Sequence, residues 1–476
     1  MLQILSTIFL VVYTLTIIGV VLVIITDNRN PLKTLPWILV LVLAPGAGLA
    51  IYFFFGQNLS KRRIISRRTR KRITTRLEEN DAAGGTGIPP QRLPLARLLS
   101  QTALAVPLYG SRLTPYVDGK TKMDALLEAI AGARHHIHIQ YYIFSDDETG
   151  RRLRDALTAK AREGVEVRIL YDDVGCTGVK KAFFEGMRAD GIEAYSFLHV
   201  KFPRFTSKVN YRNHRKIGVI DGRIGFIGGM NVADRYVLGI ERGNGERERW
   251  RDTHFRIEGS GVAGLQASFL SDWSATTKQA VGGPAYFPAP ERLTDNVMQI
   301  VPSGPLGKWR TLLQAVEYAV SRAAQRVWIE TPYYLPSETL NAALQEAALA
   351  GIDVRLMLPE RSDSRVVDLA SHSYLDDMMQ AGVKIAFYAP GFLHSKLLLI
   401  DDDLAVVGSA NMDFRSFEHN FEVNAFVYDR AFNARLAAIY ETDLGDCRRM
   451  TPGDWFRRPR TRRWAESFMR IFSPLL

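Results

Sequence analysis

Cysteine is scarce in this chain of 476 residues, which has only Cys176 and Cys447. Two thiols cannot build a disulfide framework, and they cannot supply the four thiolates of a structural zinc site. The scarcity is typical of proteins from a reducing compartment. Charged side chains are missing from Leu2 to Thr26, and Asp27 is the only acidic residue before residue 77. A metal site built from several carboxylates is therefore excluded from the N-terminal segment.

Two long uncharged segments make up most of residues 1–60. The first covers about residues 4–26, and a helix of that length can cross a hydrocarbon core of about 30 Å. The second covers about residues 35–55, so we expect a transmembrane helical hairpin. A cleaved signal peptide is an alternative for the first segment, but no basic region precedes it. Pro45, Gly46 and Gly48 leave open a second segment that is broken and re-entrant.

Basic residues follow the second apolar segment directly. Residues 61–76 carry nine Lys and Arg and no acidic residue. Because positive residues that flank membrane spans stay in the cytoplasm, we expect both termini and the rest of the chain to be cytoplasmic. The same cluster is suited to anionic lipid headgroups. We interpret residues 61–91 as a juxtamembrane segment that ends in a Gly- and Pro-rich linker.

The positive charge of the chain is confined to its ends. The net charge is +11, of which +9 lies in residues 61–76, +6 in residues 448–470 and +1 in residues 1–60. Residues 77–447 therefore carry −5, which lacks the broad basic footprint of a nucleic-acid-binding surface. In the C-terminal tail, apolar residues recur at helical spacing beside arginines. This pattern leaves two interpretations open, packing on the folded body or lying at the bilayer interface.

The remaining chain contains an internal repeat. Residues 125–173 and 311–360 each read as helix, strand, helix and strand. Alternating helices and short strands predict an α/β fold with mixed sheets covered on both faces. We therefore expect two tandem domains related by a pseudo-twofold axis, at residues 92–290 and 291–476.

A shorter motif recurs within the two copies, as "HRKIGVIDGRIGFIGGMN" at residues 214–231 and "HSKLLLIDDDLAVVGSAN" at residues 394–411. His-x-Lys at period two predicts that both side chains share one face of a strand. The Asp lies seven residues after the His, so on a regular strand it points to the opposite face and is better suited to a structural role. The apolar run that follows predicts a hairpin, which returns the small residues and the Asn toward the His and Lys.

These residues are suited to phosphodiester chemistry without a metal or another cofactor. One neutral imidazole attacks phosphorus, the other donates a proton to the leaving alcohol, and ammonium and amide groups stabilise the negative charge. Such a histidine needs an acceptor on its second nitrogen, and Asp252 and Glu422 lie at comparable distances downstream. The candidate catalytic residues are His214, Lys216, Asp221, His394, Lys396 and Asp401, and the candidate phosphate-binding residues are Asn231, Asn411, Gly229 and Ser409. We interpret "HHIHI" at residues 135–139 as a core strand rather than a metal cluster.

The duplicated His-x-Lys-x4-Asp pattern resembles that of the phospholipase D superfamily, and nearly the whole chain is similar to the bacterial cardiolipin synthases of that superfamily. The resemblance implies transfer of a phosphatidyl group between two phosphatidylglycerol molecules through a phosphatidyl-histidine intermediate, in the bacterial inner membrane. It also implies His214 as the nucleophile, His394 as the acid, and Asp252 and Glu422 as the residues that orient them.

One departure from the family pattern concerns the first motif. This chain has Gly228-Gly229 where the family usually has Gly-Ser, so the two halves of the site need not be equivalent. Alternatives left open are a membrane phospholipase D that hydrolyses phospholipids and another phosphatidyl-group transferase of the superfamily. The metal-dependent CDP-alcohol class is excluded, because its carboxylate cluster is missing from the spans.

Overall fold

The computed structural model describes residues 2–26, 31–52, 75, 77, 87–103, 105–197, 199, 210–241 and 247–476. The chain divides into two units, residues 1–61 with 200–211, and residues 62–199 with 212–476. Each unit is described by itself. The basic cluster and most of the predicted linker lie outside the described residues.

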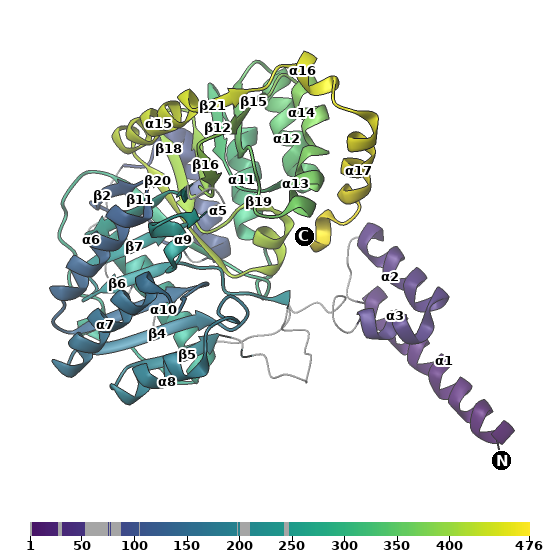
Figure 1. Ribbon diagram of the computed structural model, residues 1–476, viewed down its shortest axis with the longest axis horizontal. Coiled ribbons are helices and arrows are strands. Elements are labelled where there is room, and N and C mark those ends of the chain that lie inside the picture. The colour runs from purple at the N-terminus through teal and green to yellow at the C-terminus, as the bar shows by residue number, and fades with distance from the viewer. Residues whose placement is uncertain are drawn as a thin grey trace. The chain divides into compact units, whose positions relative to one another are not determined.

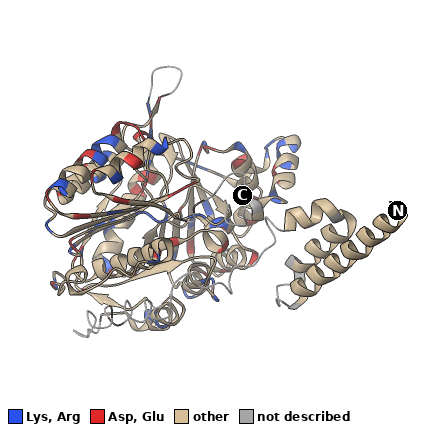
Figure 2. Cartoon of the chain, turned by 90° about the horizontal axis from the view of Figure 1, so that it is seen from below, with Lys and Arg blue, Asp and Glu red and all other residues tan. Residues whose placement is uncertain are grey.

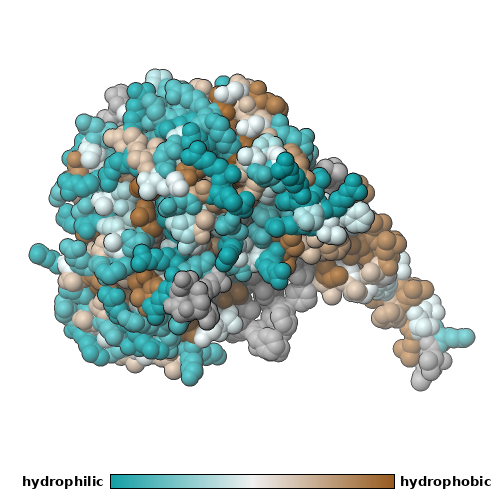
Figure 3. All heavy atoms as spheres, turned by 45° about the horizontal axis from the view of Figure 1, so that its top comes forward, coloured by the Kyte–Doolittle hydropathy of each residue, from teal (hydrophilic) through white to brown (hydrophobic). Residues whose placement is uncertain are grey.

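Among the described residues of the first unit, one helix is long enough to cross a membrane. Helix α1 (Leu2–Thr26) includes an apolar stretch of 23 residues, Gln3–Ile25, which extends about 34 Å at 1.5 Å per residue. It carries no Lys, Arg, Asp or Glu (Figure 2), and its surface is predominantly hydrophobic (Figure 3). The prediction of a first apolar span agrees with this helix.

The second apolar segment does not form one long helix. It divides into α2 (Pro31–Leu43) and α3 (Pro45–Ile51), with the break at Ala44. A side-chain Cβ at Gly48 would lie 2.6 Å from the Val40 carbonyl oxygen, so α3 folds back against α2. The 13 residues of α2 extend only about 20 Å. The expected second complete span is therefore not supported. The second segment is broken, as in the alternative of a re-entrant segment.

The second unit is built on two large mixed sheets (Figure 1), with two smaller sheets of three and two strands. The first has seven strands in the order β2-β10-β7-β6-β3-β4-β5. Its strands are β2 (Arg112–Tyr116), β3 (His136–Tyr141), β4 (Glu166–Asp172), β5 (Glu193–Phe197), β6 (Ile217–Ile220), β7 (Ile224–Gly228) and β10 (His254–Glu258). Its helices are α6 (Gly119–Ala131), α7 (Glu148–Arg162), α8 (Lys181–Ala189), α9 (Asp234–Val237) and α10 (Gly261–Thr277).

The second sheet has nine strands in the order β1-β11-β20-β18-β17-β12-β14-β15-β21. Its strands are β1 (Leu108–Tyr109), β11 (Val297–Ser303), β12 (Arg326–Glu330), β14 (Asp353–Pro359), β15 (Lys384–Tyr388), β17 (Leu397–Ile400), β18 (Leu404–Gly408), β20 (Glu422–Tyr428) and β21 (Cys447–Arg449). Its helices are α5 (Leu93–Ala103), α11 (Thr311–Ser321), α12 (Glu338–Leu349), α13 (Arg365–His372), α14 (Leu375–Gln380) and α15 (Arg430–Gly445). Although α5 and β1 come early in the chain, they pack in this second lobe.

Both sheets are covered on both faces, as the sequence predicts. Helices α6, α7 and α8 pack on the outer face of the first sheet, and α5, α11, α12 and α14 pack on the outer face of the second. The inner faces share one hydrophobic core with α10 and α15. This shared core holds the two repeats together, so residues from both can form one site.

The predicted repeat is confirmed in its local structure. The order α6, β3, α7, β4 in the first copy matches α11, β12, α12, β14 in the second. The two motif hairpins are antiparallel pairs, β6 with β7 and β17 with β18. The prediction that the His and Lys lie within a strand is wrong in both copies. His214 and Lys216 lie just before β6, and His394 and Lys396 lie just before β17.

The C-terminal tail forms α16 (Pro452–Phe456) and α17 (Arg460–Arg470), and α17 packs against α13. Glu466 is buried at this contact and binds Arg458 at 2.9 Å. The tail therefore packs on the body through one side of α17.

Candidate active site

The two repeats cross at the segments that precede the histidines. The His214 N–H donates to the Phe421 carbonyl at 2.9 Å, and the His394 N–H donates to the Arg251 carbonyl at 2.7 Å. Strand β16 (Gly391–Leu393) also pairs in parallel with β9 (Arg247–Arg251). Each histidine is thereby placed beside the acidic residue of the other repeat.

His214 is surrounded by acceptors at one nitrogen. Its Nδ1 lies 3.0 and 3.1 Å from the two carboxylate oxygens of Glu422 and 3.1 Å from the Ser409 carbonyl oxygen. Because all three neighbours are acceptors, Nδ1 carries the hydrogen and Nε2 presents a lone pair. The pKa of His214 is lowered by burial, with Glu422 opposing the effect. The imidazole is 12% exposed.

His394 has a mixed environment at the same nitrogen. Its Nδ1 lies 2.7 Å from Asp252 Oδ2 and 3.0 Å from Lys396 Nζ, so an acceptor and a donor compete for it. Burial, followed by the charge of Lys396, lowers the pKa of His394 to about 3, and Asp252 opposes this shift. The ring is 7% exposed and contacts the rings of Trp250 and Phe392.

The two motif lysines lie behind the histidines. Each donates a hydrogen bond to the carbonyl of the histidine two residues earlier, Lys216 to His214 at 2.5 Å and Lys396 to His394. Burial lowers the pKa of Lys216 to about 7 and that of Lys396 to about 8. Neither lysine lines the cavity described below.

The small residues after the hairpins differ between the two halves. The Ser409 hydroxyl donates to Glu422 Oε2 at 2.5 Å, so it contacts the acid rather than the cavity. At Gly229 a Cβ would lie 2.1 Å from Asp252 Oδ1, which leaves no room for a side chain. Asp252 therefore requires the glycine, and the longer Glu422 is paired with a serine.

The motif asparagines do reach the cavity. Asn231 donates to the Tyr236 hydroxyl at 2.7 Å and accepts from the Ile143 N–H at 3.1 Å. Asn411 donates to Asp413 at 3.1 Å, and its buried side-chain oxygen has no hydrogen-bond partner among the described residues.

The motif aspartates occupy turns away from the histidines. Asp221 (φ 54°) accepts from the backbone N–H groups of residues 134–136 at 2.8–2.9 Å. Asp401 (φ 51°) accepts from those of residues 324–326 and from Arg92 at 2.6 Å. These contacts fix the start of strands β3 and β12, so both aspartates have a structural role. This agrees with the argument that an Asp seven residues after the His points away from it.

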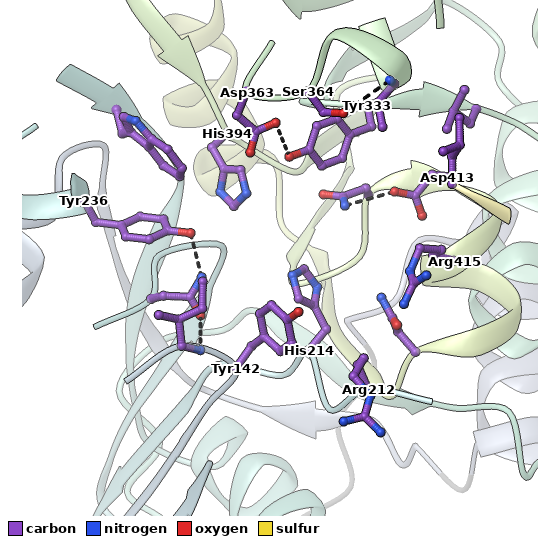
Figure 4. A pocket seen from close by; sticks show the side chains of 18 of the residues that line it. Tyr142, Arg212, His214, Tyr236, Tyr333, Asp363, Ser364, His394, Asp413 and Arg415 are labelled. Atoms are coloured by element: carbon purple, nitrogen blue, oxygen red, sulfur yellow. Dashed lines mark hydrogen bonds between the residues drawn. The ribbon is translucent and has the colours of Figure 1, made fainter. Parts of the chain in front are cut away.

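One cavity of about 320 Å³ joins the two halves of the site. Figure 4 shows His214 and His394 projecting into it, with Arg212 and Arg415 on the side of His214 and Tyr236 beside His394. The other lining residues are Tyr142, Ile143, Asn231, Arg235, Trp250, Tyr333, Leu335, Asp363, Ser364, Val367, Asn411, Asp413, Asn420 and Leu476.

Most of these wall residues were not predicted from the sequence. Tyr142 and Tyr333 follow the first strand of each repeat within tyrosine doublets, and this recurrence is a usable signal. Arg235 and Arg415 each lie four residues after a motif asparagine, which the template of His, Lys, Asp and Asn did not include. Among the described residues there is no group of three His, Cys, Asp or Glu side chains that could hold a metal ion.

Comparison with known families matches both repeats. The family described as "Cardiolipin synthase, PLD-like domain" matches residues 126–248 and 317–444, and "Phospholipase_D-nuclease N-terminal" matches residues 14–57. A cardiolipin synthase of Alkalihalophilus pseudofirmus is 39% identical over 98% of this chain and 93% of its own length. Cardiolipin synthase 2 of Bacillus cereus is 40% identical over 95% of this chain and 89% of its own.

A solved structure shows the same fold. The phosphatidylserine synthase of Haemophilus influenzae covers 80% of this chain and 98% of its own, with a TM-score of 0.60 and 14% sequence identity. At this identity the likeness concerns the fold alone.

Proposed function

Because the chain belongs to the cardiolipin synthase family of phospholipase D-like phosphatidyltransferases, we propose that it transfers a phosphatidyl group from one phosphatidylglycerol to a hydroxyl of another. The products are cardiolipin and glycerol. The observation that carries the mechanism is the pair of imidazoles, each held at Nδ1 by a buried carboxylate of the other repeat and open to one cavity.

In the first step, His214 Nε2 attacks the phosphorus of the donor lipid. The N–P bond forms, the bond from phosphorus to the glycerol oxygen breaks, and protonated His394 gives its proton to that oxygen. Acceptors alone surround Nδ1 of His214, which supports its assignment as the nucleophile. Burial favours the neutral form of His394, and an anionic phosphate beside it raises its pKa and favours the imidazolium.

In the second step, neutral His394 takes the proton from the acceptor hydroxyl, whose oxygen attacks phosphorus as the N–P bond breaks. Lys216, Lys396 and the two motif asparagines stabilise the charge on the phosphoryl oxygens. Because neither lysine lines the cavity, each acts on the phosphoryl oxygens through its positive charge, from behind its own histidine. Asp221 and Asp401 hold the strands rather than the substrate.

The cavity is suited to the headgroup rather than to the whole lipid. Its volume of about 320 Å³ is at the low end of small-ligand sites, which span about 300–1,000 Å³. Acyl chains therefore stay in the bilayer. The apolar helix α1 supports membrane attachment, and the basic residues 61–76 support a cytoplasmic body that binds anionic phospholipids.

The proposal is tested with labelled phosphatidylglycerol in mixed micelles. We expect cardiolipin and glycerol as the main products, and loss of activity in His214→Ala and His394→Ala. Phosphatidic acid as the dominant product would indicate a hydrolase instead, and activity that survives both substitutions would contradict the mechanism.

A further inference from the structure

The walls around the two histidines differ in chemistry. The rings of Tyr236, Trp250 and Phe392 lie against His394, at centroid distances of 5.3–5.7 Å. The wall around His214 is polar and cationic. Tyr142 packs edge-on against His214 at 5.0 Å, and Arg212 and Arg415 both act on the pKa of its hydroxyl, lowering it against the effect of burial.

Among the described residues, Arg415 is an unpaired cation on the His214 side of the cavity. Arg212 binds Asp172 at 3.3 Å, and Asp363 and Asp413 accept hydrogen bonds from Tyr333 and Asn411. The Arg415 guanidinium has no ion pair or hydrogen bond with any part of the chain that the structure describes, and on the His394 side the same holds for Arg235, whose buried Nε lacks a partner. Arg415 is the first residue of a π-helical turn, Arg415–His419, and such turns are frequent at functional sites.

The reaction of the proposed function brings two phosphates together. One phosphate lies between the histidines and becomes the phosphatidyl-enzyme, while the acceptor lipid carries a second phosphate one glycerol away. On the basis of that function, we propose that Arg415, next to Arg212, binds the phosphate of the acceptor phosphatidylglycerol. A guanidinium is suited to this role because it contacts two phosphate oxygens at once.

The pseudo-twofold axis supplies a comparison residue. Arg235 lies four residues after Asn231, as Arg415 does after Asn411. Its guanidinium, however, stacks over the rings of Tyr236 and Trp250 at 5.7 and 5.3 Å. Arg235 therefore contributes to the aromatic wall beside His394, and its removal tests a second unpaired arginine that stacks on rings instead of lying beside His214.

The test compares acceptors with and without a phosphate, in the full-length enzyme reconstituted in micelles. Cardiolipin formation uses phosphatidylglycerol as the acceptor, whereas exchange of labelled glycerol into phosphatidylglycerol uses free glycerol. In Arg415→Gln we expect the ratio of cardiolipin formation to glycerol exchange to fall about 10- to 100-fold. Arg415→Lys should fall less, Arg235→Gln less still, and exposed Arg162→Gln should match the wild type.

An equal loss of both reactions in Arg415→Gln would overturn the proposal, because the arginine would then serve the reacting phosphate. A larger change in Arg235→Gln than in Arg415→Gln would also overturn it. If the unaltered enzyme performs neither reaction, the proposed function itself fails, so the two failures are distinguishable.

An independent observation concerns the outer side of α17. Trp464, Phe468 and Ile471 are spaced by four and three residues, and their exposed fractions are 79%, 56% and 71%. The only acidic residue in Arg457–Arg470, Glu466, is buried on the opposite side. Arg462, Arg463 and Arg470 of α17 keep 42–47% of their side chains exposed, so the exposed surface of the helix is apolar and cationic.

The tail also leads to the active site. Helix α17 packs on α13, whose Val367 lines the cavity, and the C-terminal Leu476 lines it as well. We infer that Trp464, Phe468 and Ile471 insert into the surface of an anionic phospholipid bilayer, next to the cavity that receives the lipid headgroup. This inference, too, rests on the proposed function, since it explains how a headgroup cavity meets a substrate held in a membrane.

Serine at all three positions tests the insertion in the full chain. We expect activity on phosphatidylglycerol bilayers to fall at least about 10-fold, whereas activity on dispersed short-chain phosphatidylglycerol falls much less. Leu349→Ser, which changes another 72% exposed apolar side chain, serves as the control. Equal losses on both substrates would contradict the insertion, as would quenching by brominated lipids that is the same in Trp464→Phe and wild type.

Discussion

Replacing Glu422 with Gln tests the crossed pairing of acids and histidines. The change keeps the shape of the side chain but removes a buried negative charge 3.0 Å from Nδ1 of His214. Attack on phosphorus leaves positive charge on that ring. Coulomb's law at an effective dielectric of 20 gives about 5.5 kcal/mol at this separation. Breaking a buried pair costs roughly 3–5 kcal/mol, so we expect formation of the phosphatidyl-enzyme to slow roughly 10²- to 10⁴-fold.

A phosphatidyl ester of 4-nitrophenol isolates this step, because its leaving group needs no proton from His394. The burst of nitrophenol then measures attack by the nucleophile. We expect Glu422→Gln to lose the burst, and Asp252→Asn to keep it while later turnover slows. If Asp252→Asn loses the burst and Glu422→Gln keeps it, His394 is the nucleophile and the assignment is reversed.

Three further predictions concern the surroundings of the histidines. Gly229→Ala places a Cβ 2.1 Å from Asp252, so turnover should fall at least about 10-fold, and a variant with wild-type turnover would contradict the packing argument. Asp401→Ala leaves three backbone N–H groups without their acceptor and removes one ion pair of buried Arg92. We expect the free energy of unfolding to fall by about 3–5 kcal/mol, and an unchanged melting temperature would refute this role. The Lys396 pKa of about 8, against an ordinary 10.5, means that the unfolded chain binds more protons than the folded one between these values. From about pH 8 to 10, loss of the Lys396 charge therefore increases the free energy of unfolding. Over the same range we expect activity to decline while the melting temperature does not fall because of this lysine. Constant activity up to about pH 10 would contradict this.

Local patterns predicted the repeats because each element is encoded by neighbouring residues. The helical and strand periodicities at residues 125–173 and 311–360 recur in α6, β3, α7, β4 and in their second-copy counterparts. The motif hairpins follow from the same local logic. The second apolar segment was predicted less well, because composition does not encode the reversal at Ala44 that places Gly48 against Val40.

The sequence predicted which residues form the site, but not which acid contacts which histidine. Strand parity assigned Asp221 to a turn, because a seven-residue offset is a local property. Asp252 and Glu422 each contact the histidine of the other repeat, and these pairs are separated by 142 and 208 positions in the sequence. No single-sequence pattern specifies such distant pairs. The depth of the lysines behind the histidines likewise depends on packing of the two sheets.

Duplication alone cannot explain how the site works, because the reaction needs two unlike histidines. Two identical halves would present two equal nucleophiles and no defined place for the acceptor. This chain breaks the symmetry at three pairs of equivalent positions, with Glu422 and Ser409 against Asp252 and Gly229, and with free Arg415 against stacked Arg235. The first two differences set what surrounds each Nδ1, and the third sets the charge of each wall. If this reasoning holds, exchanging only the acids, as Glu422→Asp with Asp252→Glu, cannot exchange the roles of the histidines, because Gly229 and Ser409 fit one acid each.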